Sequence, residues 1–549
     1  WDMKQVEIYR GAQSYAQGRN AIAGAVVMTS NDPTQEWEGA AKLNMGNHRL
    51  AQTAALISGP VVKDELAFRL SVDHQQRETS VDLPHYDPVG NPRWFKATNT
   101  RAKLLWTPSA LPDLYSRLTF NHLNARAPQS ETELQPNSPR YTPERPVFQT
   151  RSASTIWDIG YQLSEHWKWE NKLVYTHFIH DRKTTSPFNT ALPPNRRGVP
   201  ARVDGNEFQI EPIVKYENEK YRGLFGLFYF NAKQDESVTM LNGRIARTPI
   251  TTNFNDKTKT KAAFGEITFT PDIPFELTLS ARYEQEHHQR KGKSAMFSIN
   301  RDKKYNVFLP KADIAWKIND DQRLGFKVGK GYNPGGAGVT FGVPYTSYEY
   351  DAEYVWNYEL YHRWTSADKR LRINSNLFYN DYKDMQLPFT LGPNSIVIRN
   401  ADKVVTYGAE INTEWQATEK LVLNAGIGML KTDIKRYPNS GIEGNKLARA
   451  PSFSGKVGAN YRLLDHLEIG TNYSYNSSYY STADNLANGK VGHYDQLDVY
   501  LAYDFKHARI TLYADNVLNS RKDILLVPRS GDITRQPERQ IGLSTELRF

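Results

Sequence analysis

The chain of 549 residues contains no cysteine. Disulfide frameworks, thiolate metal sites and cysteine nucleophiles are therefore excluded. Long apolar runs are absent as well, and the longest, AIAGAVVM at 21–28, is far shorter than the ~18 residues that a transmembrane helix needs. A helical membrane protein is excluded on this ground. A transmembrane β-barrel is not, because its strands alternate lipid-facing and interior-facing residues and are polar on average.

Sequence signatures of enzymes and metal sites are also missing. The chain has no serine-hydrolase elbow, no HExxH element and no phosphate-cradling glycine loop, so we predict no enzymatic activity and no catalytic residues. His287 and His288 are adjacent, and adjacent residues of a strand point to opposite faces, so EQEHHQRKGK (284–293) predicts a solvated basic loop that contacts lipopolysaccharide phosphates rather than a metal site. The net charge of +9 fits nucleic acid, an anionic membrane surface or acidic ligands equally well.

Period-two alternation is the strongest positive signal, and it repeats from about residue 38 to the C-terminus. In LAFRLSVD (66–73), the apolar side chains of Leu66, Phe68 and Leu70 share one face, whereas Arg69 and Asp73 lie on the other. The terminal QIGLSTELRF (540–549) alternates in the same way and ends on Phe549, which resembles the C-terminal signature of bacterial outer-membrane barrels. This pattern predicts an all-β protein.

The lengths of the connections narrow the fold class. Short polar connectors alternate with long stretches rich in Pro, Gly and Arg, as in an up-and-down barrel with one periplasmic and one extracellular rim. The short connectors are 59–65, 107–114, 164–167, 217–220, 270–276, 319–322, 365–370, 416–420, 463–466 and 505–508. The second set is 46–49, 77–97, 126–149, 183–207, 234–257, 286–303, 333–351, 386–403, 434–451, 478–493 and 520–538. We therefore predict a transmembrane antiparallel β-barrel of about 22 strands.

Tryptophan supports a membrane boundary at one rim. Most of the 11 tryptophans lie near the start of the alternating region or near a short connector. These are Trp37, Trp106, Trp167, Trp169, Trp316, Trp364 and Trp415. Because indole rings favour the membrane interface, this clustering predicts an aromatic girdle at the rim with the short turns.

The opening segment differs from the rest of the chain. A barrel of this size has a lumen too wide for its own side chains to fill, so it is either a pore or plugged. The segment VEIYRGAQSYAQGRNAIAGAVVMTSNDP (6–33) resembles the last part of the plug domain of TonB-dependent outer-membrane receptors. The matching positions are Val6, Glu7, Arg10, Gly11, Gly18, Arg19, Asn20, Ala21, Ile22, Ala23, Gly24 and 26–29. Ala12 and Ala23 depart from the Pro and Gly that are frequent in the family.

The resemblance continues along the barrel in family order, and the GYNPGG element resembles the ferric-yersiniabactin (pesticin) receptor branch. The matching elements are KGYNPGGAG (330–338), WNYELYHRW (356–364), LFYNDYKDMQ (377–386), YGAEINTEW (407–415), YADNVLNSRKD (513–523) and QPERQIGLSTELRF (536–549). It implies that 1–33 is the C-terminal remnant of a plug domain in the lumen, whose earlier part and TonB box are not in this sequence, and that 34–549 is the barrel.

Parity also predicts a charge cluster between plug and wall. In 354–364 the aromatic residues share the outward face, so Glu359 points into the lumen, and the same reasoning places Glu410 inward. Counted along the predicted strands, the two carboxylates lie two strands apart, roughly 10 Å. Arg10 can fork to both, and the resemblance implies the same roles for Arg10, Glu359 and Glu410.

The predicted outer loops are rich in tyrosine and arginine, which suit a planar, anionic and partly apolar iron chelate. The candidate ligand-binding residues are Tyr332, Tyr345, Tyr348, Tyr350, Tyr479, Tyr480, Arg196, Arg197 and Arg290. LARAPSF (447–453) lacks the Phe of the similar haem-receptor element, which argues against haem.

The resemblance implies a bacterial outer-membrane protein that transports a ferric siderophore as its ligand, with no intrinsic cofactor or metal. Its expected partners are TonB with the inner-membrane energising complex, lipopolysaccharide and outer-membrane lipid, but no nucleic acid, and the expected state is a monomer. Cobalamin, haem or an oligosaccharide are alternative cargoes, and a passive large porin or a soluble basic β-protein are alternative identities.

Overall fold

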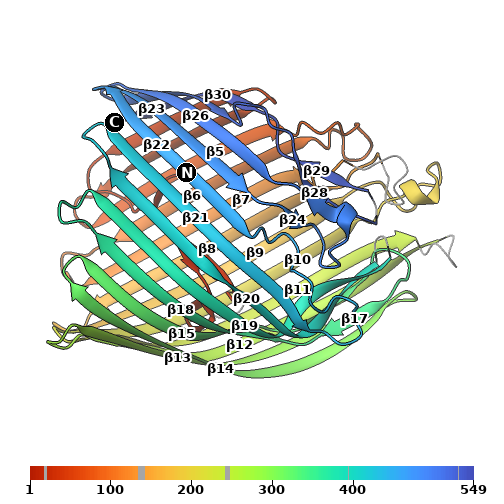
Figure 1. Ribbon diagram of the computed structural model, residues 1–549, viewed down its shortest axis with the longest axis horizontal. Coiled ribbons are helices and arrows are strands. Elements are labelled where there is room, and N and C mark those ends of the chain that lie inside the picture. Colours follow the sequence, from red (N-terminus) through yellow and green to blue (C-terminus); the bar gives the residue numbers. More distant parts are fainter. Residues whose placement is uncertain (18–20, 134–142, 242–247, 393–394, 530) are drawn as a thin grey trace.

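The computed structural model describes residues 1–17, 21–133, 143–241, 248–392, 395–529 and 531–549. Within them, 22 antiparallel strands close into one barrel (Figure 1). The predicted barrel of about 22 strands is therefore confirmed. In the described part of the chain, no helix has both the length and the apolar character needed to cross a membrane.

Each barrel strand pairs with its neighbours in sequence, and the last barrel strand closes on the first. The first half of the barrel consists of β3 (Glu38–Gly46), β4 (Ala51–Val62), β5 (Leu66–Glu78), β6 (Trp94–Trp106), β7 (Leu114–Pro128), β8 (Val147–Gln162), β9 (Trp167–Lys183), β10 (Ala201–Glu217), β11 (Tyr221–Leu241), β12 (Pro249–Phe269) and β13 (Phe275–Lys293). The second half consists of β14 (Ser298–Asn319), β15 (Gln322–Asn333), β18 (Glu353–Thr365), β19 (Leu371–Gly392), β20 (Ser395–Gln416), β21 (Leu421–Arg436), β22 (Phe453–Leu464), β23 (Leu467–Asn476), β26 (Tyr494–Asp504), β27 (Ala508–Asp515) and β30 (Gln540–Arg548).

The remaining elements lie outside the barrel sheet. The N-terminal segment contains β1 (Met3–Arg10), α1 (Ser14–Gln17) and β2 (Gly24–Ser30), and β1 pairs with β2 as a two-stranded hairpin. Positions 18–20 of the plug-like motif lie outside the described residues. The long connections carry η1 (Pro194–Arg196), β16 (Gly336–Val339), β17 (Ser347–Tyr350), β24 (Tyr479–Tyr480), η2 (Ala487–Gly489), β25 (Lys490–Val491), β28 (Asp523–Leu526) and β29 (Ile533–Arg535).

The two rims differ as the sequence predicted. A short connection stands at each predicted short connector, and the longer connections gather at the opposite end, on the right in Figure 1. The exposed tryptophans at the short-turn rim are Trp37, Trp106, Trp167, Trp316 and Trp415. Their indole rings are therefore placed to meet the membrane interface.

Three predicted loops are largely strand in the structure. The sequence predicted loops at 234–257, 286–303 and 386–403, but β11 to β14, β19 and β20 continue through most of these ranges. The polar composition suggested loops, yet alternation persists, because inward side chains such as Val238, Phe254 and Ile299 are buried in one hydrophobic cluster. Val339 and Tyr345, from the β16–β17 hairpin, pack on this cluster. These strands therefore continue where other residues of the chain cover their inner faces.

The seam of the barrel is closed by β30, which pairs with β27 on one side and β3 on the other. At the short-turn rim, the Gly39 N–H donates to the Phe549 carbonyl at 3.1 Å, and the Phe549 N–H donates to the Gly39 carbonyl at 3.0 Å. A Cβ at position 39 would lie 2.2 Å from the Phe549 ring, so a larger residue there would have to displace that ring. The terminal residue therefore joins the last strand to the first through its backbone.

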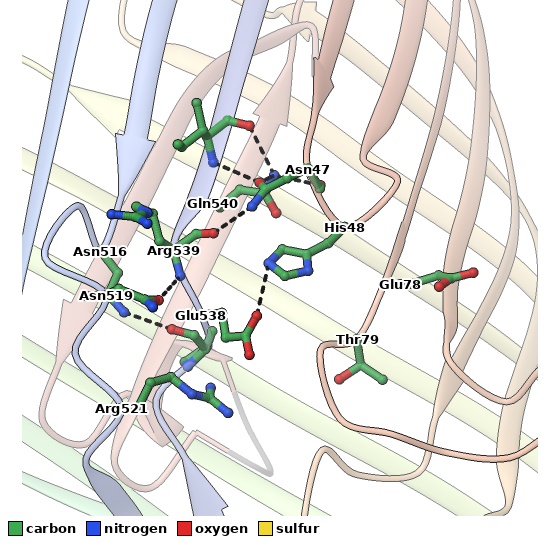
Figure 2. Close-up of polar contacts among 12 residues, drawn as sticks. Asn47, His48, Glu78, Thr79, Asn516, Asn519, Arg521, Glu538, Arg539 and Gln540 are labelled. Atoms are coloured by element: carbon green, nitrogen blue, oxygen red, sulfur yellow. Dashed lines mark hydrogen bonds and ion pairs between the residues drawn. The ribbon is translucent and has the colours of Figure 1, made fainter.

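At the other end of the seam, Asn47 bridges the β3–β4 turn and β30 (Figure 2). Its side-chain amide donates to the Arg539 carbonyl at 2.8 Å, and its side-chain oxygen accepts from the Ile541 N–H at 2.8 Å and from the Gln540 side chain at 2.6 Å. Figure 2 also shows His48 facing Glu538, at 3.8 Å. The Asn47 side chain therefore satisfies the Arg539 carbonyl and the Ile541 N–H where the pairing of β3 with β30 ends.

We expect Asn47→Ala to destabilise the seam by about 1–3 kcal/mol, because the substitution removes all three side-chain hydrogen bonds. The midpoint temperature of heat modification on a detergent gel should fall. Asn519→Ala is the matched control, since the Asn519 side-chain oxygen accepts one bond from Arg539 at the same rim. Equal midpoints for wild type and Asn47→Ala would contradict this role.

Candidate functional site

The described part of the N-terminal segment, residues 1–17 and 21–33, lies inside the barrel (Figure 1, dark red). Its two ends bind β5, β6 and β7, whereas Arg10 binds β20 and α1 contacts β13, β14 and β15. These two groups of strands are about half the closed sheet apart. A segment that contacts both walls must cross the bore, and we take this crossing as the candidate functional site.

One anchor joins Asp2 to β5. Arg69 forks onto the Asp2 carboxylate, with Nε to Oδ2 at 2.7 Å and Nη2 to Oδ1 at 2.5 Å. Both side chains are almost fully buried, at 2% exposure for Asp2 and 5% for Arg69. Burial alone would raise the pKa of Asp2, but hydrogen bonds from Arg69 and Asn31 outweigh it and hold the pKa below the ordinary 3.8. The pair is therefore ionised at neutral pH.

A second anchor joins Asp32 to β6 and β7. Lys103 Nζ lies 3.1 Å from Asp32 Oδ1, and Arg117 Nε lies 2.8 Å from the same oxygen. Lys103 also donates to the Ser30 side chain at 3.0 Å. Burial raises the pKa of Asp32, but the charges of Arg117 and Lys103 lower it further, so that the net shift is downward. Both ends of the hairpin are thus tied to the same wall.

The contact with the opposite wall is more hydrated. Arg10 Nη1 lies 2.5 Å from Glu410 Oε2, and the two side chains are 59% and 29% exposed. Glu359 lines the same cavity of about 660 Å³ as Arg10. Its partners, however, are Lys327 at 3.1 Å and the Asn376 amide at 2.5 Å. The structure therefore brings Arg10 and Glu410 together and places Glu359 beside them with a different cation.

Neutral contacts complete this second side. The Tyr332 N–H donates to Ser14 Oγ at 3.1 Å, and the Ser14 hydroxyl donates back to the Tyr332 carbonyl at 3.3 Å. The Tyr332 ring is fully buried, and its hydroxyl donates to Glu284, which also accepts from Arg282 at 3.1 Å. Tyr332, predicted to bind ligand, thus lies buried where the segment meets the wall, with its ring packed on Val307 and Leu309.

The predicted ligand-binding residues around the β16–β17 hairpin lie together near the outer mouth. Tyr348 and Tyr350 stack with ring centroids 6.3 Å apart, and the Tyr345 hydroxyl donates to the Leu241 carbonyl at 3.4 Å. Burial raises the pKa of Tyr348, so its phenol stays protonated. Arg290 is committed to two carboxylates, Asp256 at 2.5 Å and Glu236 at 2.9 Å.

The other predicted ligand-binding residues form two separate groups. Tyr479 donates to the Ile524 carbonyl at 2.5 Å, and burial raises its pKa to about 12. Tyr480 lies under the Lys490 ammonium, 5.5 Å from the ring centroid. Arg196 and Arg197, in and beside η1, line a cavity of the mouth to which Tyr345 also contributes. Of the predicted ligand-binding residues, the structure therefore brings Tyr345, Arg196 and Arg197 together, whereas Tyr479 and Tyr480 do not line this cavity.

The buried anchors were missed by sequence reasoning. Arg69 was recognised only as lying on the non-lipid face of its strand, and Asp2, Asp32, Lys103 and Arg117 were not singled out. A signal existed, because an inward cation in a lipid-spanning strand needs an anionic partner. The sequence alone could not say that this partner is one of the hairpin ends.

The described residues do not meet the requirements of a metal site. Among the described residues, no group of three or more His, Asp or Glu side chains could hold a metal ion. The arrangement instead provides charged and hydrogen-bonding contacts that tie a short segment across a wide bore.

Comparisons with known proteins agree with this architecture. The family model for the TonB dependent receptor-like beta-barrel matches residues 86–519. The pesticin receptor of Yersinia pestis is 22% identical over 306 residues, covering 53% of this chain and 44% of that protein. The aligned region therefore spans less than half of that relative.

Solved structures share the fold along the whole chain. The ferric yersiniabactin uptake receptor FyuA from Yersinia pestis superposes with a TM-score of 0.84 at 18% identity, covering 100% of this chain and 85% of that one. The siderophore receptor PiuA from Acinetobacter baumannii gives 0.78 at 14% identity, covering 100% and 86%. The copper transporter OprC gives 0.77 at 13% identity, covering 100% and 86%. With the family model matching most of its length, the chain belongs to the TonB-dependent receptors, which are β-barrels of the bacterial outer membrane and not enzymes.

Proposed function

We propose that this protein imports a ferric siderophore across the outer membrane by TonB-dependent active transport, with residues 1–33 as the C-terminal part of its plug and 34–549 as its barrel. The observation that carries the proposal is the segment in the bore, anchored to one wall through Asp2 and Asp32 and to the other through Arg10. A passive porin would have no need for a polypeptide tied across its lumen.

The hairpin itself supports the assignment to a plug. Its apolar side chains Val6, Ile8, Val26 and Met28 lie on one face and are more than half exposed within the bore. A two-stranded sheet is marginally stable alone, and an exposed apolar face of this kind calls for a covering element. The remainder of a plug domain is the covering element that we propose.

The anchors suggest how such a plug would move. Breaking a buried ion pair costs about 3–5 kcal/mol, whereas an exposed pair contributes less than about 1 kcal/mol. A pull on the plug would therefore release the Arg10–Glu410 contact first, while Asp2 and Asp32 keep the hairpin on β5, β6 and β7. The barrel holds no energy source of its own, and TonB, drawing on the inner-membrane proton gradient, is the partner we propose for the pull.

The cargo is the least constrained part of the proposal. PiuA is a siderophore receptor and FyuA is a ferric yersiniabactin uptake receptor, whereas OprC, which superposes comparably, is a copper transporter. We favour a ferric siderophore because tyrosine and arginine gather at the mouth, where Tyr348 and Arg197 are examples. Copper, cobalamin, haem and oligosaccharide remain the alternatives that a cargo panel would separate.

The test is uptake of a panel of 55Fe-labelled ferric siderophores by cells that carry this protein as their sole receptor. We expect at least one chelate to accumulate, and its accumulation to vanish in a strain without TonB or after the proton gradient is collapsed. Radiolabelled copper serves as the competing cargo. Accumulation that persists without TonB would support the passive porin, and accumulation of copper alone would replace the siderophore.

The two kinds of anchor should respond differently to substitution. We expect Arg69→Gln to weaken retention of segment 1–33 strongly, because Asp2 would stay buried without its cation. Arg10→Ala should leave the segment in place but raise its mobility near Gln13, measured with a spin label introduced there. Arg372→Gln is the control, since Arg372 pairs with Glu414 and not with the segment. Wild-type mobility and uptake in Arg10→Ala would contradict the proposed release at Glu410.

A further inference from the structure

A cavity of about 320 Å³ opens at the outer mouth, apart from the crossing described above. It lies between the connection after β7, the connection after β9 that contains η1, and the tip of the β16–β17 hairpin. Its volume is at the lower end of the ~300–1,000 Å³ typical of small-molecule sites. Val199 and Met240, which belong to a hydrophobic cluster, give it an apolar floor.

Four guanidinium groups line the cavity, and they come from both connections and from β9. These are Arg145, Arg182, Arg196 and Arg197. The only carboxylate among the described lining residues is Glu144, which is buried and accepts from Arg196, with Nε to Oε2 at 3.0 Å. The cavity therefore has an excess of positive charge, and it already holds one carboxylate in a forked arginine contact.

Arg182 and Arg197 keep donor capacity for an anion. Arg182 donates to the Gln129 side chain at 3.1 Å and to the Val199 carbonyl. Arg197 donates through Nε to the Leu192 carbonyl at 2.9 Å. All of these acceptors are neutral, and within the described ranges neither arginine is paired with a carboxylate. The two side chains are thus held in place by neutral oxygens while their charge is not offset.

The loops around the cavity are held in a defined shape. The Thr185 hydroxyl donates to the Arg196 carbonyl at 2.9 Å, which fixes η1 against the end of β9. A Cβ at Gly198 would lie 2.4 Å from Thr184 Oγ1, so the chain can turn this closely over the mouth only with glycine there. Arg145 donates to the Thr132 carbonyl at 2.8 Å. The cationic groups are therefore preorganised before any ligand arrives.

The cavity faces the bore and not the lipid. Tyr175 on β9 is exposed on the outer surface, and Arg182, an odd number of residues further along the same strand, points inward. Met240, at the cavity floor, is buried on the inner side of β11. A ligand must therefore enter from solution through the mouth, which excludes the acyl region of the membrane as its source.

We propose that this cavity binds a carboxylate or phosphate group of a soluble ligand, with Arg182 and Arg197 as the binding residues. Planar guanidinium groups pair with either oxyanion in a forked geometry. An apolar part of the same ligand would rest on Val199 and Met240. This inference rests on the proposed function in one respect: the ligand captured at the mouth is the transported cargo, which is then a chelate with anionic oxygens.

The experiment titrates the detergent-solubilised full chain with citrate and with inorganic phosphate by calorimetry at low salt. We expect at least one of them to bind, and Arg182→Gln and Arg197→Gln each to weaken that binding by about tenfold, as removal of one charge-assisted contact requires. Preference for citrate indicates a carboxylate ligand, and preference for phosphate indicates a phosphorylated one.

Arg202→Gln is the matched control. Arg202 lies on β10 next to Ala201, which pairs with Arg182, but its side chain is on the opposite face and 52% exposed beside Asp181. It should leave binding unchanged, and heat modification should confirm that each variant is folded. The trimethyl ester of citrate, which is neutral, should not bind. Equal affinities for wild type and the Arg182/Arg197 double variant, or equal affinities for citrate and its ester, would overturn the proposal.

The outcome for this site is separable from that for the proposed function. Loss of oxyanion binding in the double variant, with uptake that needs no TonB, supports the cavity and contradicts the transport proposal. Unchanged oxyanion binding in the double variant, with uptake that needs TonB, overturns the cavity and leaves transport standing.

Discussion

The buried pair of Asp2 and Arg69 attaches the start of the N-terminal segment to the barrel wall. Arg69 is buried on the inner face of β5, where it pairs with Asp2 of the N-terminal segment and with Glu38 of β3. Asp32 likewise pairs with both Lys103 and Arg117. These contacts fix where the segment enters and leaves the bore, and therefore which strands it can reach in between.

The opposite wall has a different chemistry. There, a hydrated ion pair at Arg10 and buried hydrogen bonds between the Ser14 hydroxyl and the Tyr332 backbone hold the segment. An exposed ion pair contributes little to stability. Of the ion pairs that hold the segment, the one at Arg10 is therefore the weakest. Above it, the β16–β17 hairpin is the direct continuation of β15, so the strand that carries Tyr332 also leads to the hairpin at the mouth.

Much of the fold was accessible from the sequence because alternation and turn chemistry are local. The outward rows such as Leu66, Phe68 and Leu70 and the short connectors fixed strand number and rims, since each depends on a few neighbouring residues. The predicted loops at 234–257, 286–303 and 386–403 were too long. In the first two ranges, inner-face residues pack with the β16–β17 hairpin, and β17 also contacts β20, and a local pattern reveals neither contact. The candidate site was harder to predict from the sequence, because its contacts also join residues that are distant in the chain.

Parity predicted that Glu359 and Glu410 point inward, but it could not choose between Arg10 and Lys327 as the partner of Glu359, because both cations reach that space only in the closed barrel. Arg290 illustrates the converse, since its charge suggested an exposed ligand contact, whereas Asp256 and Glu236 from neighbouring strands already bind it.

Residues 1–17 and 21–33 lie across the bore, and because the chain contains no cysteine, engineered cysteine pairs can measure this arrangement directly. A Cβ at position 331 would lie 2.9 Å from the Ala12 Cβ, within about 1 Å of the ~3.8 Å spacing of a disulfide. The account predicts that Ala12→Cys with Gly331→Cys forms an intramolecular disulfide in whole cells, and that Ala12→Cys with Gly458→Cys, on a more distant strand, does not. Absence of the first disulfide under oxidising conditions, or equal formation of both, would contradict it.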